Sequence, residues 1–122
     1  MDKGEKKPRV LIVEDERRII KLLKISFQLA GFTVSSAQDG REALSLIESE
    51  PPDIMVLDII LPEMGGLELL ETLAPTRRFP VIAISSNLNL KTGAMKLGAE
   101  NFIVKPFNPG TVVSTAIALL KR

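Results

Sequence analysis

Short apolar segments rich in β-branched residues alternate along the chain with segments whose apolar residues recur every three or four positions. The short segments cover residues 9–13, 32–36, 53–57, 80–84 and 101–104, and their length and composition predict β-strands. The longer segments have the spacing of amphipathic helices. Because alternating strands and helices form βαβ units, the chain should fold into a parallel sheet with helices on both faces.

The composition of each predicted strand indicates its place in the sheet. The first, third and fourth strands contain continuous apolar runs, as central strands do, whereas the second alternates between apolar and polar residues, as edge strands do. We therefore predict an α/β fold with a doubly wound, five-stranded parallel sheet in the order 2-1-3-4-5, flanked by five helices. The 122 residues suit one domain. Residues 1–8 are expected to be a flexible basic arm, and residues 9–122 the folded domain.

Residues that start or stop helices mark the ends of the predicted helices. Gly31 ends the first helix, and Asn108 and Pro109 supply the N-cap and the first turn of the fifth. The segment between Ser85 and Gly98 contains several poor helix formers, so we expect the fourth helix to be short or mobile. The apolar rows of the helices are interpreted as core, and they include Leu22, Ala30 and Met95.

The amino-acid composition excludes several kinds of functional site. The chain has no His and no Cys, which excludes disulfides, zinc fingers and catalysis by Ser-His or Cys-His pairs. It also lacks Trp and Tyr, the usual platforms for stacked bases or flavins. Sixteen basic and fifteen acidic residues are too balanced for a nucleic-acid surface. Since no apolar run suits a membrane span or a secretion signal, we expect a cytoplasmic protein that contacts neither membrane nor nucleic acid directly.

Polar residues that could carry chemistry follow four of the five predicted strands. Because the carboxyl ends of parallel strands meet at one edge of an open sheet, where ligands bind, these side chains should converge there. They comprise three carboxylates, a pair of serines and one lysine. The set is Glu14, Asp15, Asp58, Ser85, Ser86 and Lys105.

Each of these residues alone has a simpler explanation, but their convergence does not. Glu14 and Asp15 could start a helix, and Ser85 and Lys105 could be ordinary loop residues. Asp58 lies in a long apolar run, where an ionised group is costly unless it is paired or metal-bound. Three clustered carboxylates repel one another unless a cation lies among them, and a set of oxygen ligands suits Mg²⁺. A carboxylate beside Mg²⁺ and a lysine can attack a phosphoryl group and form an aspartyl phosphate.

Taken in order, these residues resemble the receiver domains of two-component response regulators. The resemblance covers residues 9–121 and implies a flavodoxin-like fold, in agreement with the predicted strand order. The signature positions each fall at their own strand end. The matching motifs are Val-Glu-Asp-Glu (13–16), Leu-Asp-Ile-Ile-Leu-Pro (57–62), Gly-Gly (65–66), Ile-Ser-Ser (84–86), Leu-Gly-Ala (97–99) and Val-Lys-Pro-Phe (104–107).

The resemblance implies a role for each residue of the set. Asp58 would accept the phosphoryl group, and Lys105 would pair with that group or, before phosphorylation, with Asp58. Ser85 would hydrogen-bond a phosphoryl oxygen, Ser86 would donate its backbone N–H, and Phe102 would rotate into the space that Ser85 leaves. Mg²⁺ is the implied cofactor, and its implied ligands are Asp58, Asp15, Glu14 through a water molecule, and the Ile60 backbone carbonyl.

The resemblance further implies a signalling domain rather than an enzyme, one that catalyses only its own phosphorylation and dephosphorylation. A sensor histidine kinase or a phosphotransfer protein would supply the phosphoryl group. Phosphorylation would switch the face formed by the fourth helix, fifth strand and fifth helix, which a downstream protein or a C-terminal effector domain outside this sequence would read. Because residues 108–120 carry no charge, we expect no ionic dimer interface there and predict a monomer.

Three other functions fit parts of the pattern. A pseudo-receiver, which would bind partners without phosphorylation, is disfavoured by the complete set of Asp15, Asp58, Ser85 and Lys105. An aspartate-nucleophile phosphatase generally needs a second aspartate two positions after the nucleophile, where this chain has Ile60, which cannot transfer protons. A flavin carrier would need a phosphate-binding loop after the first strand, but the carboxylates there would repel phosphate.

Overall fold

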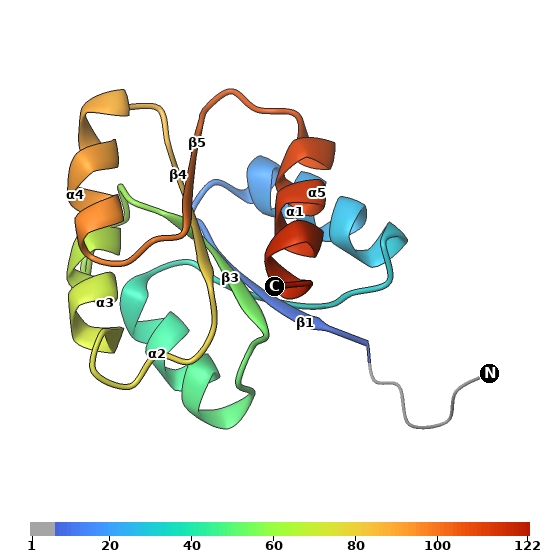
Figure 1. Ribbon diagram of the computed structural model, residues 1–122, viewed down its shortest axis with the longest axis horizontal. Coiled ribbons are helices and arrows are strands. Elements are labelled where there is room, and N and C mark those ends of the chain that lie inside the picture. The colour runs from blue at the N-terminus through green and yellow to red at the C-terminus, as the bar shows by residue number, and fades with distance from the viewer. Residues whose placement is uncertain (1–6) are drawn as a thin grey trace.

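The computed structural model describes residues 7–122, so the expected basic arm lies outside the described residues except for Lys7 and Pro8. Strands and helices alternate as predicted (Figure 1). The strands are β1 (Arg9–Val13), β2 (Thr33–Ala37), β3 (Ile54–Asp58), β4 (Val81–Ser85) and β5 (Asn101–Val104). The helices are α1 (Arg17–Leu29), α2 (Gly40–Ser49), α3 (Gly66–Leu73), the 3₁₀ helix η1 (Leu88–Leu90), α4 (Lys91–Lys96) and α5 (Pro109–Leu120).

The strands form one parallel sheet in the order β2-β1-β3-β4-β5, which confirms the predicted topology. Helices α1 and α5 cover one face, and α2, α3 and α4 cover the other (Figure 1). β2, β3 and β4 each lie one residue later than predicted, because Ala37 pairs with Val13, Asp58 with Ile84 and Ser85 with Val104. Asp58 and Ser85 are therefore the last residues of their strands, and backbone pairing fixes their positions.

Alternate residues of the central strands pack into separate cores on the two faces. In β1, Val10 and Ile12 pack on the same side as Phe27 of α1. Leu11 and Val13 pack on the other side, toward α2 and α3. Because both faces are covered, successive residues of such a strand are apolar on both sides, which explains the continuous apolar runs in the sequence. This packing fixes the carboxyl ends of the central strands, where the predicted site residues lie.

The ends of several helices agree with the sequence-based predictions. Asn108 caps α5 by accepting a hydrogen bond from the Gly110 N–H at 2.8 Å, and Pro109 is the first residue of that helix. Gly31 follows α1 with a φ of +93°, which glycine adopts without strain. α4 has six residues, so the prediction of a short fourth helix is confirmed. None of the helices within residues 7–122 combines the length and the apolar character that a membrane span needs.

The interpretation of Leu22, Ala30 and Met95 as core residues is wrong. Leu22 is 50% exposed, Met95 is 39% exposed, and Ala30 is exposed just beyond the end of α1. Consecutive helical residues are rotated by about 100° around the helix axis. Leu22 therefore turns away from the sheet when Leu23 faces it, and Met95 turns away when Ala94 is buried.

Gly66, the first residue of α3, approaches the end of β3 too closely for a side chain. A Cβ atom there would lie 2.6 Å from Ile59 Cα and 2.7 Å from the Asp58 carbonyl oxygen. We therefore expect Gly66→Ala to lower the free energy of unfolding by about 1–3 kcal/mol, as overpacking does, measured by urea denaturation. Gly65→Ser is the matched control, because its Cβ would lie 3.9 Å from the Ile59 carbonyl oxygen and serine is a good N-cap. Equal losses in the two variants would contradict this explanation.

Candidate functional site

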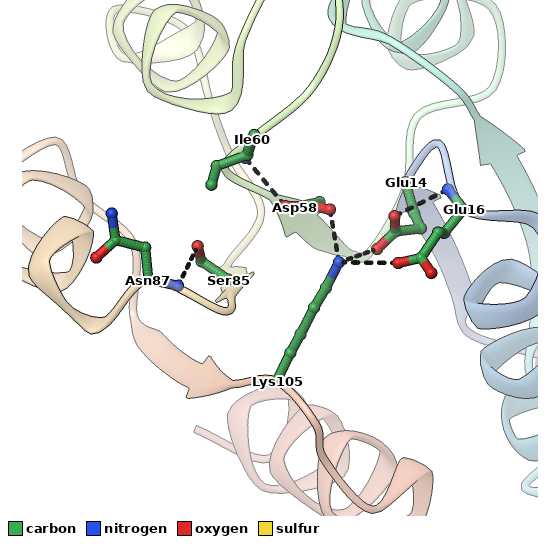
Figure 2. A network of polar contacts seen from close by, with 7 residues as sticks. All are labelled: Glu14, Glu16, Asp58, Ile60, Ser85, Asn87 and Lys105. Atoms are coloured by element: carbon green, nitrogen blue, oxygen red, sulfur yellow. Dashed lines mark hydrogen bonds and ion pairs between the residues drawn. The ribbon is translucent and has the colours of Figure 1, made fainter.

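The predicted site residues converge at the carboxyl edge of the sheet (Figure 2). Asp58 ends β3, Ser85 ends β4 and Glu14 directly follows β1, and all three side chains are buried. Lys105 directly follows β5, and its side chain extends into the middle of the cluster (Figure 2). Glu14 is 0% exposed, which is rare for a carboxylate unless an opposite charge accompanies it. The site is therefore built around buried charge.

The Lys105 ammonium group lies among three carboxylates. Its Nζ atom donates a hydrogen bond to Asp58 Oδ2 at 2.8 Å and lies 3.1 Å from Glu14 Oε1. A third carboxylate oxygen, Glu16 Oε2, lies 3.8 Å from the same atom. The contact between Lys105 and Asp58 is the pairing that the family resemblance implies for the protein before phosphorylation.

Both oxygens of Asp58 are held in defined directions. Oδ1 accepts a hydrogen bond from the Ile60 backbone N–H at 3.0 Å, while Oδ2 accepts one from Lys105. The Ile59 N–H donates to the Ile84 carbonyl oxygen, which keeps the chain beyond β3 against β4. The carboxylate is thus oriented and faces a cation, as an activated nucleophile requires.

Burial changes the proton affinities of Glu14 and Lys105. For Glu14, burial raises the pKa to about 7, and the charge of Asp58 adds to the rise, while the Glu16 N–H and the Lys105 ammonium oppose it. For Lys105, burial lowers the pKa, but the hydrogen bond to Asp58 and the contact with Glu14 outweigh burial and leave the pKa raised. Lys105 therefore keeps its positive charge at neutral pH.

Three carboxylates lie close enough to share a cation. Glu14, Asp15 and Asp58 each offer one oxygen within 4.8 Å of the others, and Asp15 is exposed. The buried Glu14 Oε1 accepts no hydrogen bond from any described residue, although Lys105 lies near it. An all-oxygen ligand set that contains one buried oxygen without a hydrogen bond fits a hard cation such as Mg²⁺.

The two serines after the fourth apolar run differ in exposure. Ser85 is buried, and its Oγ accepts a hydrogen bond from the Asn87 N–H at 3.0 Å. Ser86 is exposed and lines a pocket of about 380 Å³ together with Lys105. In Figure 2, Ser85 and Asn87 lie on one side of Asp58, and Glu14 lies on the other. The serines therefore complete the edge of the site on the side of β4.

Phe102 lies in the core beneath α4. It is 8% exposed and belongs to the same buried cluster as Ala83, Ala94 and Ala99. Its ring is already buried in this structure, and its rotation toward Ser85 stays a prediction.

Sequence reasoning missed Glu16, whose carboxylate lies beside Lys105. An acidic residue next to the start of a helix has an ordinary explanation in the helix dipole, so it drew no separate interpretation. The signal that could have identified it is the run of three consecutive acids, residues 14–16, at the end of a central strand.

A family model and curated relatives both match most of the chain. A family model described as the response regulator receiver domain matches residues 10–117. The chain is 35% identical over 117 residues to the alkaline phosphatase synthesis transcriptional regulatory protein PhoP of Bacillus subtilis, covering 93% of this chain and 49% of PhoP. It is also 35% identical over 117 residues to the transcriptional regulatory protein CpxR of Escherichia coli, covering 93% of this chain and 50% of CpxR. The chain thus spans about half the length of these relatives.

Solved structures match the fold closely. A CheY-like response regulator receiver domain protein from Methanospirillum hungatei superimposes with a TM-score of 0.89 at 30% identity, covering 95% of each chain. The receiver domain of the Francisella response regulator 1452 gives a TM-score of 0.88 at 31% identity, covering 95% of this chain and 98% of that one. Fold and sequence therefore agree on one family.

The raised pKa of Glu14 predicts how stability depends on pH. The folded protein binds a proton at Glu14 more tightly than the unfolded chain, whose glutamate has a pKa of 4.5. This contribution to the free energy of unfolding is fully present below about pH 4.5 and is lost as the pH rises to about 7. In EDTA, we expect Glu14→Gln to gain stability relative to the wild type by roughly 1–3 kcal/mol between pH 5 and pH 8. The free energies of unfolding of both proteins are measured by urea denaturation at each pH. If they changed with pH in parallel, the result would contradict a raised pKa of Glu14.

Proposed function

Because this chain belongs to the receiver domain family of two-component response regulators, we propose that Asp58 accepts a phosphoryl group in a reaction that requires Mg²⁺. Receiver domains of this family are signalling domains. The observation that carries the proposal is the hydrogen bond between Lys105 and Asp58 beside the three-carboxylate cluster. A nucleophile, a fixed positive charge and a candidate cation site lie together where parallel strands end.

In the proposed reaction, an oxygen of Asp58 attacks the phosphorus atom of the donor and forms a new P–O bond. The bond from phosphorus to the donor atom breaks, and the leaving group departs with the bonding electron pair. Lys105 Nζ lies 2.8 Å from Asp58 Oδ2, close enough to stabilise charge on the transferred group. The Ser85 hydroxyl and the Ser86 backbone N–H, at the end of the neighbouring strand β4, would hydrogen-bond phosphoryl oxygens.

The proposed Mg²⁺ ligands are Asp15, Asp58, Glu14 through a water molecule, and the Ile60 backbone carbonyl. When bound, Mg²⁺ would neutralise charge that the phosphoryl group brings to the carboxylates. The backbone after β3 supports this arrangement, because the Ile60 N–H is tied to Asp58 Oδ1. That hydrogen bond holds the backbone of Ile60 directly beside the Asp58 carboxylate.

We propose that α4, β5 and α5 report the phosphorylation. Ser85, drawn toward a phosphoryl oxygen, would give up its hydrogen bond from the Asn87 N–H and loosen the segment that leads into α4. Phe102, in the same buried cluster as Ala94 of α4, would then shift into the space that Ser85 leaves. Since α4 has six residues, losing these contacts would change its position at low cost.

The proposed donor is a sensor histidine kinase or a phosphotransfer protein that docks beside α1. The pocket of about 380 Å³ opens there next to Lys105, and Ile19, Leu22 and Phe107 form apolar parts of its wall. An apolar surface at the entrance to a polar site suits a protein donor. α1 also exposes four basic residues along its length, namely Arg17, Arg18, Lys21 and Lys24.

The proposed output partner is a downstream protein or an effector domain. The matched relatives are about twice as long as this chain, and the names of PhoP and CpxR describe transcriptional regulators.

We propose a monomer for this chain, because α5 carries no charged residue for an ionic dimer interface. The pseudo-receiver alternative gains no support, since the pairing of Lys105 with Asp58 is suited to phosphorylation.

Incubation with acetyl phosphate and Mg²⁺ tests the proposal. We expect intact-protein mass spectrometry to show one added phosphoryl group in the wild type and none in Asp58→Asn. Replacing Mg²⁺ by EDTA should abolish the adduct, and Asp15→Asn should need much more Mg²⁺ for the same rate, because it removes a charged ligand. An adduct that persists in Asp58→Asn would place the phosphoacceptor elsewhere, and no adduct in the wild type would favour the pseudo-receiver.

The side chain of Ile60 is expected to prolong the lifetime of the aspartyl phosphate. It is exposed beside Asp58 (Figure 2), where an apolar group hinders the approach of an attacking water molecule. We expect Ile60→Asn to accelerate the loss of the phosphoryl group several-fold, because an amide can orient that water. Ile60→Leu keeps the bulk and should decay like the wild type. An unchanged decay rate in Ile60→Asn, followed by mass spectrometry after removal of the donor, would contradict this role.

A further inference from the structure

Glu16 is placed unusually for a residue that begins a helix. It is the N-cap of α1, a position whose side chain commonly accepts a hydrogen bond from a backbone N–H two or three residues later. Within the described part of the chain, the Glu16 side chain makes no such bond. Its Oε2 atom instead lies 3.8 Å from Lys105 Nζ (Figure 2). The carboxylate therefore contacts the site instead of capping its own helix.

The backbone of Glu16 holds this carboxylate at the mouth of the site. Its N–H donates a hydrogen bond to Glu14 Oε2 at 3.0 Å, which fixes the start of α1 against the buried cluster. The Glu16 side chain is 66% exposed and lines the pocket of about 380 Å³ together with Lys105 and Ser86. A phosphodonor that reaches Lys105 through this pocket meets a negative charge first.

We propose that Glu16 is a positioning residue that slows the capture of small anionic phosphodonors by competing with them for Lys105. The inference rests on the proposed phosphorylation of Asp58. As a donor arrives, Lys105 exchanges its contact with Glu16 for a phosphoryl oxygen, and the exposed Glu16 side chain turns toward solvent. A protein donor can offset the cost of this competition with binding energy from surfaces away from its phosphoryl group.

A purely structural role for Glu16 makes a different prediction. A carboxylate at a helix N-terminus is stabilised by the helix dipole, and the first turn of α1 contains Arg17 and Arg18 instead of acids. If the dipole alone explained Glu16, its substitution would alter the free energy of unfolding and leave the reaction with donors unchanged. The competing role instead predicts a change in reactivity that depends on the charge of the donor.

The test compares phosphorylation rates of Glu16→Gln and the wild type with acetyl phosphate and Mg²⁺ at low ionic strength, followed by intact-protein mass. In water, one unit charge several ångströms from a dianion changes its capture by roughly three- to tenfold. We expect Glu16→Gln to be faster by that factor at low donor concentration, with an unchanged maximal rate. Glu16→Ser, which removes the charge but keeps an N-cap residue, should show the same increase in phosphorylation rate as Glu16→Gln. Glu48→Gln, which removes an exposed carboxylate at the far end of α2, should match the wild type.

Two further comparisons separate the charge from structural effects. At 1 M salt, where the Debye length is about 3 Å, the ratio of the rates should approach one. Phosphoramidate, which carries one negative charge fewer than acetyl phosphate near neutral pH, should show a smaller ratio. Equal rates for Glu16→Gln and the wild type at low salt, or an acceleration that neither salt nor donor charge alters, would overturn the role of Glu16. The absence of any adduct in the wild type would instead refute the proposed function, and this inference with it.

Discussion

The burial of charge at the carboxyl ends of parallel strands is the constraint on which the rest of the structure depends. Glu14 and Asp58 are buried side by side, which is costly unless an opposite charge is close. Lys105 supplies that charge from β5, although β4 lies between β5 and β3. Neighbouring strands are about 4.8 Å apart, so the side chain must reach past the end of β4. Only a long cationic side chain can do this. The packing of the sheet holds both the backbone that carries Lys105 and the end of β3 that carries Asp58.

Much of this arrangement could be predicted from the sequence because the functional residues interrupt or end apolar runs. Asp58 stands out in a strand buried on both faces, and Glu14 directly follows another such strand. The rule that parallel strands end at one edge brings their side chains together without any knowledge of contacts. The ends of β3 and β4 were predicted one residue too early, since they are set by the pairing of Asp58 with Ile84 and Ser85 with Val104. The sequence of one strand does not show where this pairing ends, because the pairing also depends on the neighbouring strand.

Features that depend on side-chain direction could not be predicted in this way. Apolar residues occur on more than one side of α1, so periodicity alone does not decide which row faces the sheet. Packing selects the row that contains Leu23 and leaves Leu22 half exposed. Similarly, the sequence shows that Glu16 stands at the start of a helix, but the choice between capping that helix and contacting Lys105 depends on a residue 89 positions later. The residues next to Glu16 in the sequence therefore do not determine which of the two contacts its side chain makes.

The charges of the site do not balance without a further partner. The four carboxylates of Glu14, Asp15, Glu16 and Asp58 can carry four negative charges against the single positive charge of Lys105. Because the pKa of Glu14 is raised to about 7, a proton can remove one of these charges near neutral pH. A divalent cation among the carboxylates would remove more charge and would displace that proton, whereas an incoming phosphoryl group would add charge. A site with this imbalance is sensitive to any single change of charge, and that sensitivity lets one phosphoryl group alter contacts in a fold that is otherwise rigidly packed.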